Sequence, residues 1–235
     1  MPVGTARAVM QGATMVAGSE GPPTVVAPWF GVTVGSASSL SATIDGQAGE
    51  LLVALALMPN ERHISLPTGW SFLTDEFDHD GNAAMNGRWL YRQLSGALAS
   101  ETFSWTGGSG DDQMVMGVRI TGHNAGSPFD PVNAHAENLA EVSQAPTSPD
   151  LTTTVPNCRI LRAFLWDNGA TAVTQDAGYP PGTTGLLVRR NTGVSLWMGM
   201  AHEEQRTPGP VGTADWGPYP STSRRNIGLT VAVRA

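Results

Sequence analysis

The sequence predicts an all-β protein built as one sandwich from two similar halves. Apolar residues alternate with polar ones between turns rich in Gly, Pro, Ser and Asn, which is the period of a strand with one buried face. The order of these segments recurs after residue 156. Only 14% of the residues are charged, below the roughly 25% of ordinary soluble domains, which favours uncharged strands and turns.

The first half, residues 31–121, reads as a succession of strands. Alternation over residues 32–44 predicts one or two half-buried strands, and residues 51–58 are apolar on both faces, as in a central strand covered on both sides. A Pro-Thr-Gly turn precedes an aromatic strand at 89–91, and a Thr/Trp segment follows at 102–105. The half closes on an alternating strand whose inward side chains are Met114, Met116, Val118 and Ile120.

Residues 122–156 predict a crossover between the halves, because they are rich in Pro, Asn, Ser and acids. Within it, residues 134–142 could form a short helix and residues 151–155 resemble a strand.

The second half, residues 157–235, repeats the order of the first. An apolar run at 160–166 is followed by a Pro-Pro-Gly turn and by an alternating strand from Val194. Trp216 then occupies a position like that of Trp105, and a closing strand covers 227–234. Such halves bury their apolar faces best against each other. We therefore expect one sandwich of about eleven strands over residues 31–235, preceded by an extended N-terminal arm, residues 1–30, that docks on a neighbour.

The charge pattern argues against nucleic acid as a partner. The net charge is -7, and the 13 basic residues are all arginine, with no cluster that could follow a phosphate backbone. Lysine, a common guard against edge-to-edge strand pairing, is absent, so edges are expected to be short, covered, bulged or paired.

Other features also narrow the class of protein. The lone Cys158 cannot form an intrachain disulfide and is expected in the core. No stretch approaches the about 20 apolar residues of a membrane span. Residues 1–18 have no continuous apolar run, so the sequence predicts no signal peptide and synthesis in a cytoplasm.

An acidic loop is the one candidate metal site. Glu76, Asp78 and Asp80 alternate before Gly81, a pattern like the first half of a calcium loop. Gly87 stands where that loop has its bidentate glutamate. Because this ligand is missing, a solvated acidic hairpin loop is the alternative. Ca²⁺ is the one cofactor that the sequence suggests.

Aromatic residues in Pro/Gly-rich turns are the candidate ligand contacts. Tyr179, Trp216 and Tyr219 are expected to expose rigid, amphipathic rings that a glycan could stack on. Packing over the open end of the sandwich is the alternative for these three. The tryptophans within strand patterns, such as Trp89, are expected in the core.

The sequence predicts no enzyme. The paired acids Asp111-Asp112 and Glu203-Glu204 would point to opposite faces of a strand, whereas glycoside hydrolysis needs facing carboxyl groups roughly 5 to 9.5 Å apart. The five histidines are scattered without metal-ligand spacing. A polysaccharide-degrading enzyme remains an alternative.

Six segments together resemble a known family. They are residues 49–54 (GELLVA), 67–70 (PTGW), 89–91 (WLY), 103–105 (FSW), 115–118 (VMGV) and 229–234 (LTVAVR). They resemble jelly-roll-like β-sandwich domains of virion proteins from tailed bacteriophages and gene transfer agents, and the resemblance covers roughly residues 30–235.

The resemblance implies a virion structural protein, a head- or tail-associated fibre, spike or decoration component. Such a protein would assemble as a homo-oligomer, expected to be a trimer, hold other virion proteins through residues 1–30, and contact a host surface glycan. The family offers no catalytic residues to transfer. A free lectin-like carbohydrate-binding module is the alternative function.

Overall fold

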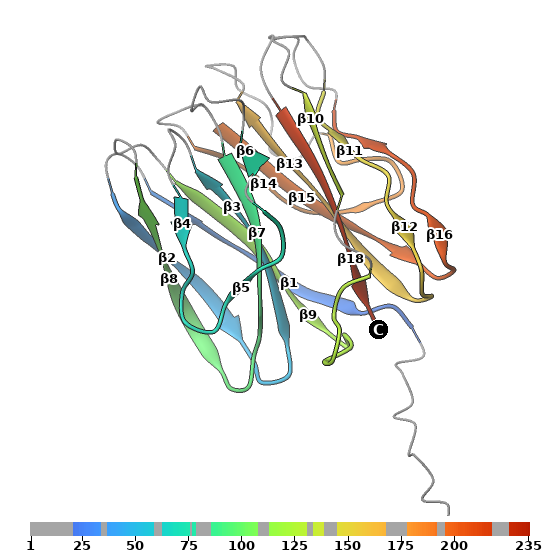
Figure 1. Cartoon of the computed structure of the whole chain (residues 1–235), viewed down its shortest axis with the longest axis horizontal. Helices are drawn as coiled ribbons and strands as arrows, with labels where there is room; N and C mark the ends of the chain where they lie inside the picture. The colour runs from blue at the N-terminus through green and yellow to red at the C-terminus, as the bar shows by residue number, and fades with distance from the viewer. Residues whose placement is uncertain are drawn as a thin grey trace, which may run out of the picture.

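The computed structural model describes residues 21–33, 37–58, 63–75, 77–78, 86–107, 113–130, 134–138, 145–167, 178–191, 196–217 and 226–235. Within these ranges every regular element is a β-strand. The strands form four layers that stand side by side in Figure 1. The all-β sandwich that the period-two pattern predicts is therefore confirmed.

The first half supplies two of the four layers. Inner sheet one has the strand order β1-β9-β3-β7-β5, with β6 also paired to β7, and outer layer one has the order β2-β8-β4. Consecutive strands therefore alternate between the layers from β1 to β4 and again from β7 to β9. The bounds are β1 Thr24–Val32, β2 Ser39–Gly46, β3 Leu51–Met58, β4 His63–Ser65, β5 Ser71–Phe72, β6 Phe77–Asp78, β7 Asn86–Gln93, β8 Leu98–Thr106 and β9 Met114–Thr121.

The second half repeats this topology. Inner sheet two has the order β10-β18-β13-β15-β14, while β11 pairs with β17 and β12 with β16 to form outer layer two. The two inner orders correspond strand by strand: β1, β9, β3, β7 and β5 of the first half match β10, β18, β13, β15 and β14 of the second half. The bounds are β10 Ala134–Asn138, β11 Thr147–Ser148, β12 Thr152–Thr153, β13 Cys158–Asp167, β14 Thr184–Asn191, β15 Leu196–Gln205, β16 Gly209–Pro210, β17 Ala214–Asp215 and β18 Asn226–Arg234.

The layers enclose a shared core and separate cores within each half. The inner sheets face each other across the shared core, to which Leu55 of β3, Met116 of β9 and Leu161 of β13 contribute. Outer layer one covers a core around Phe103, and outer layer two covers cores such as the one around Phe164. The central strands are thus buried on both faces, which explains their continuous apolar runs.

The strand edges are protected without lysine. The edge strand β1 carries Pro28 and a register shift between Val25 and Ala27, and the edge strand β14 has a shift between Gly185 and Leu187. Strands β5 and β6 have 2 residues each. Bulges, proline and short strands all disfavour pairing with another chain, as expected from the composition.

Three sequence predictions need correction. Residues 24–30 belong to β1 rather than to an arm. The helix expected over residues 134–142 is wrong, because residues 134–138 form β10 along the edge of inner sheet two; residues 139–142 lie outside the described ranges. The described residues contain eighteen strands rather than about eleven, because short outer strands, including β11 and β12 within the expected crossover, cover the second half.

Candidate functional site

Two turns of the same shape occupy the same place in each half. In the first, Trp70 N donates to the Pro67 carbonyl at 3.1 Å, and in the second, Thr183 N donates to the Pro180 carbonyl at 3.2 Å. The glycine at the third position of the turn has a φ of 83° in the first case and 82° in the second. This is the geometry of a type II turn, which favours glycine there. Each turn leads into an edge strand and lines a pocket.

The pairing registers align the two pockets. Ser71 of β5 pairs with Tyr91 of β7, and Thr184 of β14 pairs with His202 of β15. Ser71 and Thr184 each lie two residues after the glycine of their turn. Tyr91 and His202 therefore occupy equivalent positions in the two halves. Two residues further on, Gln93 corresponds in the same way to Glu204.

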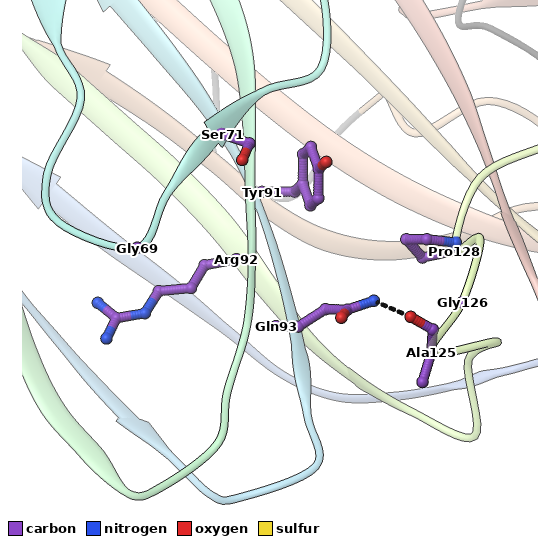
Figure 2. A pocket seen from close by; sticks show the side chains of 8 residues that line it. All are labelled: Gly69, Ser71, Tyr91, Arg92, Gln93, Ala125, Gly126 and Pro128. Carbon is purple, nitrogen blue, oxygen red and sulfur yellow. Dashed lines mark hydrogen bonds between the residues drawn. The ribbon is translucent and has the colours of Figure 1, made fainter.

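The pocket of the first half, which we call the crossover pocket, has a volume of about 330 Å³. Figure 2 shows it between the strands β5 and β7 on one side and the segment that leaves β9 on the other. Gln93 Nε2 donates to the Ala125 carbonyl at 2.9 Å, and the Tyr91 ring meets the Phe129 ring at 77° with centroids 5.0 Å apart. The lining residues are Gly69, Ser71, Tyr91, Arg92, Gln93, Ala125, Gly126 and Pro128.

The crossover pocket combines a compensated charge with unused hydrogen-bonding groups. Arg92 Nη1 lies 2.7 Å from Glu101 Oε2, so the charge of the guanidinium is balanced within the protein. Ser71 Oγ, Tyr91 Oη and Gln93 Oε1 make no hydrogen bond within the part of the chain that the structure describes. Three polar groups therefore face this hollow with hydrogen-bonding capacity to spare.

The pocket of the second half, which we call the junction pocket, has a volume of about 500 Å³. It lies where the start of β1 meets inner sheet two, with Thr24, Val25 and Thr184 among its lining residues. Arg159 of β13 is buried there, with 7% of its surface exposed. Its Nε donates to the Pro23 carbonyl at 2.7 Å, so this side chain links the first half to the second.

The remaining contacts of Arg159 fix the protonation of its neighbours. Its Nη1 lies 3.1 Å from His202 Nδ1, and because arginine is only a donor, Nδ1 must accept and the ring proton sits on Nε2. Burial lowers the pKa of His202, the charge of Arg159 lowers it further, and Glu204 opposes both. Arg159 Nη2 also donates to Glu204 Oε1 at 3.1 Å.

Glu204 completes this internal network. Its Oε2 accepts from Arg206 Nη2 at 2.6 Å, and this hydrogen bond is the largest reason that the pKa of Glu204 lies below its usual value. The charged groups of the junction pocket thus satisfy one another, which is the arrangement of a structural link between the halves.

The adjacent acids Glu203 and Glu204 point to opposite faces of β15, as predicted for a strand. Glu203 Oε1 accepts from Arg162 Nε at 2.6 Å, whereas Glu204 meets Arg159 on the face toward the first half. Each carboxylate therefore has its own arginine, and the two do not face each other. The other predicted acid pair, Asp111-Asp112, lies outside the described residues.

The expected exposure of Trp216 is wrong. The residue is fully buried, its ring lies 4.7 Å from Phe164 between centroids, and its Nε1 donates to Ser148 Oγ at 2.8 Å. The ring packs onto inner sheet two, a contact that the turn-rich sequence alone did not reveal.

The other two predicted ligand contacts have different outcomes. Tyr179 is half-buried with its ring centroid 6.1 Å from that of Trp216, and ligand binding by it stays a prediction. Tyr219 lies outside the described residues.

The predicted calcium loop is placed only in part. Asp78 belongs to β6, where its backbone pairs with Asn86, while Glu76 and Asp80 lie outside the described ranges. Among the residues that are described, no three His, Cys, Asp or Glu side chains gather as metal ligands would. Calcium binding by this loop stays a prediction.

Sequence reasoning missed the residues that shape both pockets, above all Tyr91, Gln93 and Arg159. The available signal was the pair of Pro-X-Gly turns that contain Gly69 and Gly182. Aligning the two halves on these glycines would have matched the strand after the first turn with the strand after the second turn.

Comparison of the chain with protein-family models, curated proteins and solved structures finds no match. The described part of the chain also contains no helix of the length and apolar character that crossing a membrane requires.

Proposed function

We propose that this chain is a structural component of a phage-type virion, a fibre, spike or decoration protein of the head or tail. In this proposal each half is a jelly roll, the chain assembles as a homo-oligomer, and an exposed pocket contacts a host surface glycan. The charged groups of the junction pocket bind one another, and this supports a scaffold and binding role in the proposal.

The strand order is the observation that carries the proposal. In the first half, the order β1-β9-β3-β7 lies over β2-β8-β4, so successive strands cross between two sheets. The second half repeats the inner order and again pairs the strands that cover it. This order supports jelly-roll halves, and double-sheet jelly rolls recur in viral capsid and lectin domains.

The path of the chain at residues 21–24 supports anchoring by residues 1–20, which precede it. The chain enters inner sheet one at Thr24, directly beside the junction pocket, and the Pro23 carbonyl is held by Arg159. Since the strand edges are bulged or short, contacts with other copies are expected through this segment and through layer faces rather than by adding strands.

Particle analysis tests the proposal. Particles purified from cultures of the organism that encodes the chain would be examined by mass spectrometry and by immunogold electron microscopy against the folded protein. We expect the chain in the particle fraction with label at regular positions. Its absence from purified particles, with the protein present in the cell extract, would contradict a virion role.

Sedimentation analysis of the purified full chain tests assembly. We expect a homo-oligomer, with a trimer as the sequence-based expectation, and weaker association or weaker particle incorporation for a variant that lacks residues 1–20. A chain that stays monomeric at high concentration and enters particles without residues 1–20 would contradict the assembly and anchoring parts of the proposal.

A further inference from the structure

We propose that the crossover pocket is the glycan site, and that it binds one uncharged sugar ring against Tyr91. This inference rests on the glycan contact in the proposed function and assigns it to residues outside the turns of the second half. The volume of about 330 Å³ is at the small end of ligand pockets, which suits one ring rather than an extended chain.

The unused polar groups of the pocket match the chemistry of sugar hydroxyls. Ser71 Oγ and Tyr91 Oη can each donate and accept, and Gln93 Oε1 can accept. A sugar hydroxyl also does both, so neighbouring hydroxyls on one ring can bind this mixed set. Gln93 is held in place by its bond to the Ala125 carbonyl, which reduces the entropy lost on binding.

The charge balance favours an uncharged ligand over an anion. Arg92 is the one cation among the lining residues, and it lies against Glu101, which also accepts a hydrogen bond from Trp70 Nε1 at 3.0 Å. Because this carboxylate compensates the guanidinium, a phosphate or carboxylate ligand would gain little Coulomb attraction. Tyr91 is the one aromatic residue that lines the pocket, and we expect the C–H face of the sugar to lie against its half-buried ring, which also packs against Phe129.

The equivalent pocket of the second half provides an internal comparison. At the positions of Tyr91 and Gln93 it has His202 and Glu204, and both bind Arg159. At these two positions, therefore, the junction pocket has side chains that bind a buried arginine, whereas the crossover pocket has uncharged side chains with unused hydrogen-bonding atoms. A ligand can bind these groups of the crossover pocket without competing with an internal arginine, so we assign ligand binding to this member of the pair.

Saturation-transfer NMR of the full chain tests this inference. The probes are the methyl glycosides of glucose, galactose, mannose and N-acetylglucosamine, with sialyllactose as the charged probe. We expect saturation of at least one uncharged probe. Titration of that probe should show about tenfold weaker binding to Ser71→Ala and Gln93→Ala, since each removes one hydrogen bond to the ligand.

Thr184→Ala is the matched control, because Thr184 occupies in the junction pocket the place of Ser71. We expect this variant to bind the sugar as the unchanged chain does, and each variant would be checked for an unaltered Tm. Absence of transfer from every uncharged probe would overturn the inference, as would undiminished binding by Gln93→Ala or weakened binding by Thr184→Ala. Sugar binding by a chain that is missing from particles would leave this inference standing and refute the virion role.

Discussion

Replacing Leu161 by alanine tests whether the two halves unfold together. Leu161 lies in β13 with no exposed surface, in the core that both inner sheets share. The substitution removes about three carbon atoms, worth roughly 2.4 kcal/mol at about 0.8 kcal/mol per buried methylene. The remaining cavity raises the expected loss in the free energy of unfolding to about 2.7–5 kcal/mol.

Scanning calorimetry measures this loss as a fall in Tm. A chain of 235 residues loses about 2–4 °C per kcal/mol, so Leu161→Ala should lower Tm by about 5–20 °C. Because the halves share one core, we expect a single transition both before and after the substitution.

Leu52→Ala is the matched control. Leu52 is equally buried but packs under outer layer one, within the first half. If the shared core couples the halves, this variant also shifts one single transition. Two resolved transitions, of which Leu52→Ala moves only one, would refute the reasoning, as would a loss below about 1 kcal/mol for Leu161→Ala.

Further predictions concern close packing, a buried thiol and a buried histidine. Gly228→Ala should reduce the free energy of unfolding, measured in urea, by about 1–3 kcal/mol, because the new Cβ would clash with the Thr147 carbonyl oxygen. Gly96 has open space around it, so Gly96→Ala should change this free energy by about 0.5 kcal/mol or less. Burial raises the pKa of Cys158 to about 11, so the thiol should react with Ellman's reagent at pH 8 only after unfolding, and rapid reaction of the folded chain would contradict its placement. The pKa of His202 is lowered in the folded protein, so the unfolded chain binds the proton more readily and stability should fall as pH drops below about 6.5. Urea titrations between pH 8 and 5 should show this loss reduced in His202→Gln, and an equal slope in both proteins would count against it.

Local patterns in the sequence predicted the strands well, because the order of apolar and polar residues along a strand follows which of its faces are buried. Strand β2 alternates buried and exposed residues along its length, as its period-two sequence requires. The apolar run of β3 reflects burial on both faces. The recurrence of these patterns predicted two similar halves, which the repeated strand order bears out.

Predictions failed where distant segments decide the outcome. Residues 134–138 have helix-compatible composition but form β10, because pairing with β18 completes the edge of inner sheet two. Trp216 lies in a Gly/Pro-rich stretch that looked exposed, yet its ring is buried against Phe164 of inner sheet two. A local sequence pattern does not identify the distant segment that covers an aromatic ring or pairs with a strand.

The candidate site depended on the tertiary structure even more. Tyr91 and Gln93 read as ordinary strand residues, and only the return of the chain at Ala125 and Pro128 encloses the pocket beside them. In the other half, Arg159 could be recognised as a link between halves only from its bond to Pro23, 136 residues away.

Local sequence patterns were enough to predict the strand class, the turns, the duplicated order and the doubly buried central strands. These follow from side-chain alternation and from glycine and proline conformations, which act over a few residues. Only the tertiary structure shows that each half carries its own outer layer, and that the residues equivalent to Tyr91 and Gln93 in the second half bind Arg159. Those outcomes depend on contacts between residues far apart in the chain, which no local pattern encodes.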